Sequence, residues 1–304
     1  MGRVVPGWWA TQSESYLRSL SRRARRPNTL IAYRNELDDF GTWLLEQRIK
    51  SLSELKRIHI EDWQDDLQTR KKVSTQGVAA TALRGFLKWA ADQELDLASP
   101  TLWLRVATPR VPPPLPRPIP TRDLEVIKRA LADAEPAQIW RLRTRALFWL
   151  IYSSGCRISE ALSLMRSAFG DGDNIAVVQK GGRRHTLVIS EGARQALADY
   201  QLQRRDRVPS LFASLDSPDD DQPLRKREVQ ESWDLLAAAL EVERFTTHQL
   251  RHSCATDLLR ETGDIMLAAK HLGHRSLQAI QGYAEVAMDK RRQAVATLDG
   301  RMAG

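Results

Sequence analysis

A proline-rich stretch near the middle of the chain sets the strongest limit on the fold. Residues 108–120 read Thr-Pro-Arg-Val-Pro-Pro-Pro-Leu-Pro-Arg-Pro-Ile-Pro. Because proline removes a backbone donor and fixes φ, this stretch cannot form a helix or a central strand. It is predicted to be an extended, semi-rigid linker. The 304 residues are therefore expected to form two domains, over residues 1–107 and 121–304.

Helical periodicity dominates the stretch before the linker. Apolar residues recur at three- and four-residue steps from Tyr33 to Leu44, and again from Val78 to Trp89. This spacing is typical of amphipathic helices. A further helix is predicted around residues 60–67. The first domain is thus expected to be a small bundle of four or five helices.

A basic cluster lies just before Pro27 and Asn28, which predict a helix stop followed by an N-cap. The cluster consists of Arg22, Arg23, Arg25 and Arg26. A solvated turn is one explanation. Beside a helix N-terminus, however, arginines can equally clamp backbone phosphates.

Composition narrows the range of partners and compartments. The 46 basic and 38 acidic residues give a net charge of +8, which favours a polyanionic partner. The two cysteines, Cys156 and Cys254, are too few for a disulfide framework, so reduced, partly buried thiols are expected. The apolar run from Ala146 to Tyr152 is far shorter than the ~20 residues of a membrane span, and no signal peptide is evident. We expect a soluble, cytoplasmic protein without membrane contact.

A glycine turn in the second half precedes a candidate anion site. An apolar helix through residues 144–152 is predicted to end at Ser-Ser-Gly155, and a new helix begins near Cys156. Arg157 stands at the amino end of that helix, where free N–H groups and a guanidinium point to the same place. Pairing of Arg157 with Glu160 is the alternative.

A β-hairpin is predicted between residues 174 and 189. Two β-rich runs meet at Gly181-Gly182, a pair typical of tight hairpin turns. Lys180 lies at the tip of the hairpin, where its ammonium group is either solvated or placed in a groove of a bound partner. Arg183 and Arg184 follow the turn and are candidate DNA contacts. The whole chain is therefore expected to be mainly α with a small β-sheet, an α+β protein.

The acidic run Asp219, Asp220 and Asp221 raises the question of a metal-dependent nuclease. Metal-binding carboxylates usually come from separate, rigid elements, and this run is flanked by Ser217 and Pro218. A polar surface loop is the better interpretation. No metal and no cofactor are predicted.

The stretch from Thr246 to Tyr283 carries the most chemistry. His248 and Arg251 are three residues apart at a predicted helix start, so both side chains lie on one face. His274 follows a glycine that can end the next helix, and Tyr283 comes nine residues later. Two imidazoles, a guanidinium and a phenol suit the attack of a tyrosine on a phosphodiester.

Taken together, these features resemble the tyrosine recombinases of the phage integrase and Xer type. The segment Ser-Gly-Cys-Arg-Ile-Ser-Glu-Ala-Leu is similar to the first arginine box of that family, and the histidine-rich stretch resembles its His-x-x-Arg and Leu-Gly-His boxes. The resemblance fills six catalytic positions in order: Arg157, Lys180, His248, Arg251, His274 and Tyr283. It implies a helical, SAM-like core-binding domain in residues 1–107 and a mixed catalytic domain in residues 121–304, which together form a clamp around DNA.

Each group has a role that its chemistry allows. A phenol with a pKa of about 10 needs a proton acceptor and a polarised phosphorus. Arg157 and Arg251 are expected to bind the non-bridging oxygens. His248 is the candidate acceptor, with His274 the alternative, and Lys180 is expected to protonate the leaving 5′ oxygen. Cutting and joining then become one reversible exchange without ATP.

Neighbouring histidines need separate assignments. His252 and His271 lie close in sequence to functional histidines. Successive side chains on a helix are rotated by about 100°, so adjacent residues point in different directions. We expect both to be packing groups or to support the histidines that contact substrate.

The resemblance also implies partners. Double-stranded DNA recombination sites are the expected substrate, so a nucleoid-associated location is expected. Related recombinases pass a C-terminal tail to a neighbouring protomer, and residues 288–298 form a narrow apolar stripe that suits this role. Four protomers on two duplexes are expected, either identical or paired with a sister recombinase. A type IB topoisomerase and a non-catalytic DNA-binding protein on the same fold are the alternatives.

Overall fold

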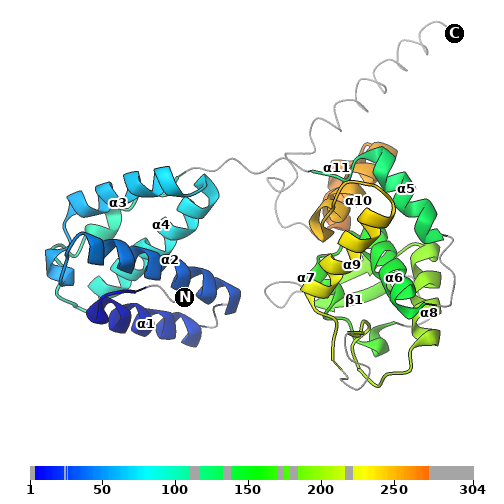
Figure 1. The fold of residues 1–304 in the computed structure, drawn as a ribbon, viewed down its shortest axis with the longest axis horizontal. Coiled ribbons are helices and arrows are strands. Elements are labelled where there is room, and N and C mark those ends of the chain that lie inside the picture. The colour runs from blue at the N-terminus through cyan, green and yellow to red at the C-terminus, as the bar shows by residue number, and fades with distance from the viewer. Residues whose placement is uncertain are drawn as a thin grey trace, which may run out of the picture. The chain divides into compact units, whose positions relative to one another are not determined.

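The structure is a computed structural model. It describes residues 4–23, 25, 27–109, 117–132, 138–169, 174–178, 184–215 and 222–273. The chain divides into two compact units, Met1–Pro112 and Pro113–Gly304. The division falls inside the proline-rich stretch, and the helices of each unit are drawn in Figure 1. Each unit has its own hydrophobic core.

All the secondary-structure elements described in the first unit are helices. Its elements are α1 (Gly7–Arg22), α2 (Pro27–Glu46), the 3-10 turn η1 (Leu52–Glu54), α3 (Arg57–Arg70), α4 (Val73–Asp92) and the 3-10 turn η2 (Leu102–Arg105). The three helices predicted from periodicity are present. The predicted stripe of α2 is buried at Leu37, Phe40 and Leu44.

Aromatic rings fill the core of this unit. Trp9 lies edge-on to Phe40 at 5.0 Å between ring centroids and 4.6 Å from Phe86. Its indole N–H donates to the carbonyl of Leu37 at 2.8 Å, so burial does not leave the Trp9 indole unpaired. Trp63 of α3 packs edge-on against Phe40 at 5.0 Å. The ring cluster joins α1, α2, α3 and α4 into one bundle.

The predicted N-cap of α2 is wrong by position. The helix begins at Pro27 itself, and Asn28 lies inside the first turn. Proline suits the first helical position because the N–H it lacks would have no intrahelical partner there. The sequence signal for a helix start was correct, but proline and not asparagine marks it.

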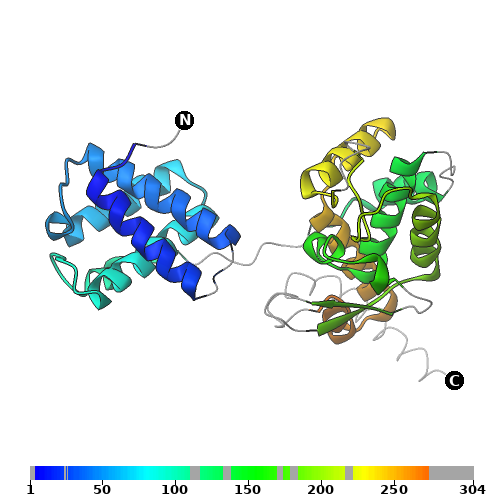
Figure 2. The same cartoon turned by 90° about the horizontal axis from the view of Figure 1, so that it is seen from below.

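The second unit is a mixed domain. Its described elements are α5 (Thr121–Ala132), α6 (Ile139–Ser154), α7 (Ile158–Ala161), the 3-10 turn η3 (Arg166–Ala168), β1 (Asn174–Val178), β2 (Arg184–Val188), α8 (Glu191–Gln203), α9 (Lys226–Ala239), α10 (Thr247–Thr262) and α11 (Ile265–His271). Figure 2 shows the two strands beside the helices.

Helix α6 is the centre of this unit. Its buried residues, which include Leu142, Phe148 and Ile151, point in several directions, as the continuous apolar run predicted. It packs against both α8 and α10. Its last residue, Ser154, is fully buried. The end of α6 therefore lies deep in the domain, where α10 can contact it.

The strands pair as the predicted antiparallel hairpin. Ile175 lies opposite Leu187, and Val177 lies opposite His185. Ile175, Val177 and Leu187 are buried against the helical core, whereas Ala176 and Thr186 are exposed. This alternation is the period of a sheet with one covered face. The fold is mainly α with a small β-sheet, as predicted.

None of the described helices is both long and apolar enough to cross a bilayer.

Candidate active site

A left-handed turn at Gly155 connects the end of α6 to the candidate site. Gly155 has φ of +59° and its N–H donates to the carbonyl of Ile151 at 2.8 Å. A side chain here would strain the backbone. It would also lie 2.3 Å from Leu272 Cδ2 and 3.2 Å from Cys254 Sγ. The predicted helix stop is confirmed, and tertiary contacts make glycine necessary for a second reason.

Arg157 follows this turn as the N-cap residue of α7. Its backbone N–H donates to Glu160 Oε2 at 2.7 Å, and its Nη1 donates to Glu160 Oε1 at 2.9 Å. Glu160 is buried, while 42% of the Arg157 side chain is exposed. The sequence alternative of pairing between Arg157 and Glu160 is therefore confirmed, and the anion site at Arg157 stays a prediction. The carboxylate orients the guanidinium, and part of the Arg157 side chain stays exposed to solvent.

Arg251 of α10 is the buried counterpart of Arg157. Its side chain donates to the carbonyl of Gly155 through Nη1 and to the carbonyl of Leu272 through Nη2, the latter at 3.0 Å. Burial, followed by the charge of Arg157, lowers the pKa of Arg251. An arginine nevertheless stays charged in proteins. Arg251 therefore links the ends of α6 and α11 and holds a positive charge at their junction.

His248 lies one turn before Arg251 on α10. The helix begins with Thr246 as N-cap, whose Oγ1 accepts from the N–H of Gln249 at 3.2 Å, while Gln249 Oε1 accepts from the N–H of Thr246 at 3.0 Å. Burial lowers the pKa of His248, and the charges of Arg251 and Arg157 lower it further. The imidazole is therefore neutral at neutral pH.

Helix α11 brings the chain back to the same place. Asp264 caps it by accepting from the N–H groups of Met266 at 2.8 Å and Leu267 at 3.0 Å. His271 is hydrogen-bonded through Nε2 to the carbonyl of Ser153 at 2.8 Å. His185 of β2 contacts the carbonyl of His271 at 3.3 Å. The end of α11 is thus attached to both α6 and the hairpin.

The structure therefore brings together three of the six predicted catalytic groups. Arg157, His248 and Arg251 come from α7 and α10 and meet around the Gly155 turn. The other three lie outside the described residues: Lys180, His274 and Tyr283. The described chain ends at Gly273, which has φ of +63° and follows the end of α11, as predicted.

Both cysteines lie beside this site, and their thiols are buried. Burial raises the pKa of Cys156 to about 11 and that of Cys254 to about 12. Neither is in a disulfide. A thiol that keeps its proton is a poor nucleophile and a poor metal ligand. In the part of the chain that the structure describes, no group of three or more His, Cys, Asp or Glu side chains is placed to hold a metal.

The predicted DNA-contacting arginines are partly described. Arg22, Arg23 and Arg25 are exposed at the end of α1, where positive charge also favours the helix dipole. Arg184 is exposed on β2 and lines a groove between β2 and α11, together with Lys270 and Gly273. Arg26 and Arg183 lie outside the described residues, as do Asp219, Asp220 and Asp221.

Sequence reasoning missed a second basic surface on the first unit. Arg84 and Lys88 of α4 lie over the ring of Trp103 in η2, at 5.5 and 5.4 Å from its centroid. The four-residue spacing of the two cations was readable as one helix face. Their shared contact with Trp103 was not, because it depends on where η2 packs against α4.

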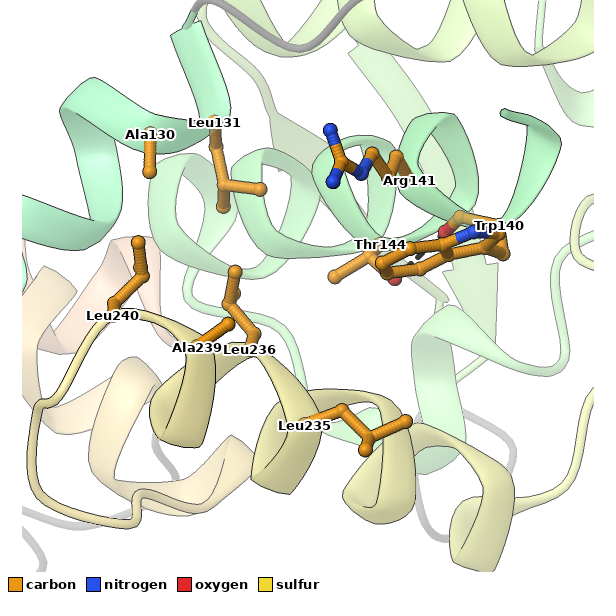
Figure 3. Close-up of a pocket in the computed structure, with 9 residues that line it drawn as sticks. All are labelled: Ala130, Leu131, Trp140, Arg141, Thr144, Leu235, Leu236, Ala239 and Leu240. Atoms are coloured by element: carbon orange, nitrogen blue, oxygen red, sulfur yellow. Dashed lines mark hydrogen bonds between the residues drawn. The ribbon is translucent and has the colours of Figure 1, made fainter. Parts of the chain in front are cut away.

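An apolar hollow lies at the other end of α6. Nine residues line it: Ala130, Leu131, Trp140, Arg141, Thr144, Leu235, Leu236, Ala239 and Leu240. Figure 3 shows Leu131 of α5 and Leu236 of α9 pointing toward one another across it. Its one charged lining residue, Arg141, stacks on Trp140 at 5.3 Å. The hydroxyl of Thr144 donates to the carbonyl of Trp140, and the other lining residues are mainly apolar, so the hollow is distinct from the Gly155 site.

Two fixed guanidinium groups beside a neutral imidazole suit a protein that handles phosphodiesters. Comparison with known proteins makes the assignment specific. Residues 123–290 match the phage integrase family, and residues 14–94 match the phage integrase N-terminal SAM-like domain. The chain belongs to the phage integrase family and is a tyrosine-type site-specific DNA recombinase.

The curated relatives that this chain resembles are tyrosine recombinases. The chain is 30% identical over 274 residues to the tyrosine recombinase XerC of Rhodospirillum centenum, covering 87% of this chain and 79% of the relative. It is 29% identical over 284 residues to the tyrosine recombinase XerD of Caulobacter vibrioides, covering 90% and 91%. These matches favour recombination over the topoisomerase and non-catalytic alternatives.

Solved structures show the same fold. The XerH site-specific recombinase bound to its palindromic difH substrate matches with a TM-score of 0.71 at 18% identity, over 89% of this chain and 80% of that chain. A lambda integrase tetramer bound to a Holliday junction matches with a TM-score of 0.65 at 18% identity, over 88% and 77%.

Proposed function

We propose that this recombinase cuts and rejoins DNA through a 3′-phosphotyrosyl bond formed by Tyr283. The observation that carries the residue assignment is the meeting of Arg157, Arg251 and His248 around Gly155. These side chains come from two elements far apart in sequence. In this proposal the scissile phosphate binds at that meeting point.

The two arginines are proposed to bind the non-bridging phosphate oxygens. Arg251 is fixed by two backbone carbonyls, and Arg157 is fixed by the buried Glu160. Donors held in place before the substrate arrives stabilise the pentacovalent state without reorganising. One arginine is buried and the other half-exposed, so the phosphate would approach from the side of Arg157.

Proton transfer is assigned to three further residues. His248 is proposed to accept the phenolic proton of Tyr283, because its lowered pKa keeps it neutral and able to accept at neutral pH. His274 is proposed to donate a hydrogen bond to a phosphate oxygen. Lys180 is proposed to give its proton to the leaving 5′ oxygen. The phosphotyrosyl ester conserves the linkage, so a 5′ hydroxyl from another strand can reverse the step without ATP.

The two units are proposed to share DNA binding. Residues 1–107 would act as the core-binding domain, residues 108–120 as the linker and residues 121–304 as the catalytic domain. The candidate phosphate contacts from sequence are Arg22, Arg23, Arg25, Arg26, Arg183 and Arg184, and the structure adds Arg84 and Lys88. Glutamine at both added positions is expected to weaken binding to a single site and to flatten its salt dependence.

The proposed assembly is four protomers on two duplexes. The lambda integrase tetramer on a Holliday junction supports it by similarity of fold. The apolar stripe in residues 288–298 is proposed to dock on the neighbouring protomer, which is either identical or a sister recombinase. Such heterologous contacts can close into a ring. The proposed reaction would integrate, excise or resolve DNA. Its proposed location is the cytoplasm, at the nucleoid.

The assignment of Tyr283 is tested by Tyr283→Phe. This change keeps the ring but removes the attacking oxygen, so DNA binding should persist while covalent adducts vanish. The measurement is SDS-resistant protein–DNA adduct on a nicked duplex, with binding to the intact duplex as the control. A phenylalanine variant that still forms the adduct would refute the assignment.

A further inference from the structure

The candidate proton acceptor has an unusual neighbour on its own helix. His248 and His252 lie one turn apart on α10, with ring centroids 4.4 Å apart and ring planes at 77°. His248 is exposed and His252 is half-buried. In the part of the chain that the structure describes, no hydrogen bond holds the His248 imidazole. Its edge-to-face contact with the His252 ring is a contact that can restrict its rotation.

Orientation matters more for this imidazole than for the arginines. A general base must lie within hydrogen-bond reach of the proton it accepts, and a misplacement of about 1 Å can cost about 10²-fold in rate. Arg157 and Arg251 are each held by oxygen acceptors. An edge-to-face ring pair biases its partner toward one orientation by roughly 2- to 10-fold. The ring of His252 supplies the restraint that no hydrogen bond supplies.

The charge of this neighbour also matters. His248 faces Arg251 on its own helix and Arg157 from α7, and the carboxylate of Glu160 faces Arg157. Burial lowers the pKa of His252 to about 4, with His248 and Arg251 lowering it further, so His252 is neutral at neutral pH. A neutral ring beside His248 adds no repulsion when His248 becomes an imidazolium ion.

We infer that His252 is a positioning residue for the proposed proton acceptor: its neutral ring holds the His248 imidazole in the orientation that receives the phenolic proton of Tyr283. This inference rests on the proposed role of His248. His252 itself does not touch the substrate. The proposed role depends on the shape and the neutrality of the His252 ring. It does not require His252 to gain or lose a proton.

Three replacements of His252 in the full chain separate these properties. His252→Phe keeps a neutral ring, His252→Leu keeps bulk without a ring, and His252→Ala removes both. The assay is single-turnover cleavage of a nicked duplex at saturating protein, from pH 5.5 to 8.5, together with the Kd for the intact duplex. The pKa of His248 is measured in parallel by NMR of the histidine-labelled chain.

The phenylalanine variant is expected to cleave within about threefold of the natural chain, and the leucine and alanine variants to lose about tenfold. The Kd for DNA should be unchanged in all three. The pKa of His248 should stay lowered with phenylalanine and rise with alanine, because losing the neighbouring ring reduces the partial burial of the imidazole.

Two outcomes would overturn the inference. If phenylalanine were as damaging as leucine, a hydrogen bond or proton of His252 would be needed and the ring contact would not. If leucine cleaved as well as phenylalanine, no aromatic restraint would exist, and this comparison holds even if the alanine variant fails to fold. His248→Ala tests the underlying assignment separately. Its cleavage at the natural rate would remove His248 as the acceptor, whatever the His252 variants did.

Discussion

Replacing Gly155 by alanine tests whether the glycine turn organises the active site. Gly155 adopts φ of +59°, and an added Cβ would lie 2.3 Å from Leu272 Cδ2. Leu272 is buried, so its side chain cannot swing into solvent. Either Leu272 or the turn must move. Both positions supply the carbonyls that hold Arg251, so the movement reaches the phosphate-binding group directly.

The magnitude follows from two costs. Left-handed backbone costs a non-glycine residue roughly 1–2 kcal/mol. Overpacking a filled core costs roughly 1–3 kcal/mol more. The free energy of unfolding should therefore fall by about 2–5 kcal/mol, which corresponds to a melting temperature lower by about 4–20 °C for a unit of this size. A shift of Arg251 by about 1 Å would reduce cleavage by about 10²-fold.

Calorimetry of the full chain measures the first effect, and single-turnover cleavage of a nicked duplex measures the second. Gly192→Ala in α8 is the matched control, because no atom lies within 4 Å of its added Cβ and its φ is not positive. That control should be stabilised by about 0.4–1 kcal/mol and should cleave normally. The reasoning fails if Gly155→Ala unfolds and cleaves like the natural chain.

Three further predictions concern chemistry, pH and assembly. Lys180→Ala should cleave normal DNA poorly but recover on a substrate whose bridging 5′ oxygen is sulfur, because a thiolate leaves without a proton; equal loss on both substrates would make Lys180 a binding residue. Burial lowers the pKa values of His248, His252 and His271. The unfolded chain therefore binds more protons below pH 6.5, and stability should fall from pH 7 toward pH 5, seen as a lower urea midpoint; an unchanged midpoint would contradict these shifts. Removing residues from Lys290 onward should spare binding to one site but weaken two-duplex complexes; unimpaired recombination would make the tail a local packing element.

Much of the site was predictable because its residues follow local rules. Gly155 ends a helix and has the positive φ that glycine favours. Thr246 and Gln249 form a capping box, which predicts where α10 begins and so places His248 and Arg251 on one face. Antiparallel pairing of the hairpin followed from β-rich runs around two glycines. All of these signals act within a few residues.

The contacts that make the site work act across long sequence separations. Arg251 donates to carbonyls 96 and 21 residues away. Arg84 and Lys88 share Trp103 only because η2 packs on α4. Local patterns carry no information about which buried carbonyl a distant guanidinium will reach.

The sequence by itself therefore determined the class of protein, the helical and hairpin elements and the identity of the residues that carry the chemistry, since these depend on residue type and short spacing. Only the tertiary structure decided how those residues are held. Packing of α10 and α11 against the end of α6 buries Arg251, lowers the pKa of His248 and leaves Arg157 half-exposed beside Glu160. Burial and hydrogen-bond geometry belong to the folded core, because they exist only once distant segments share one environment.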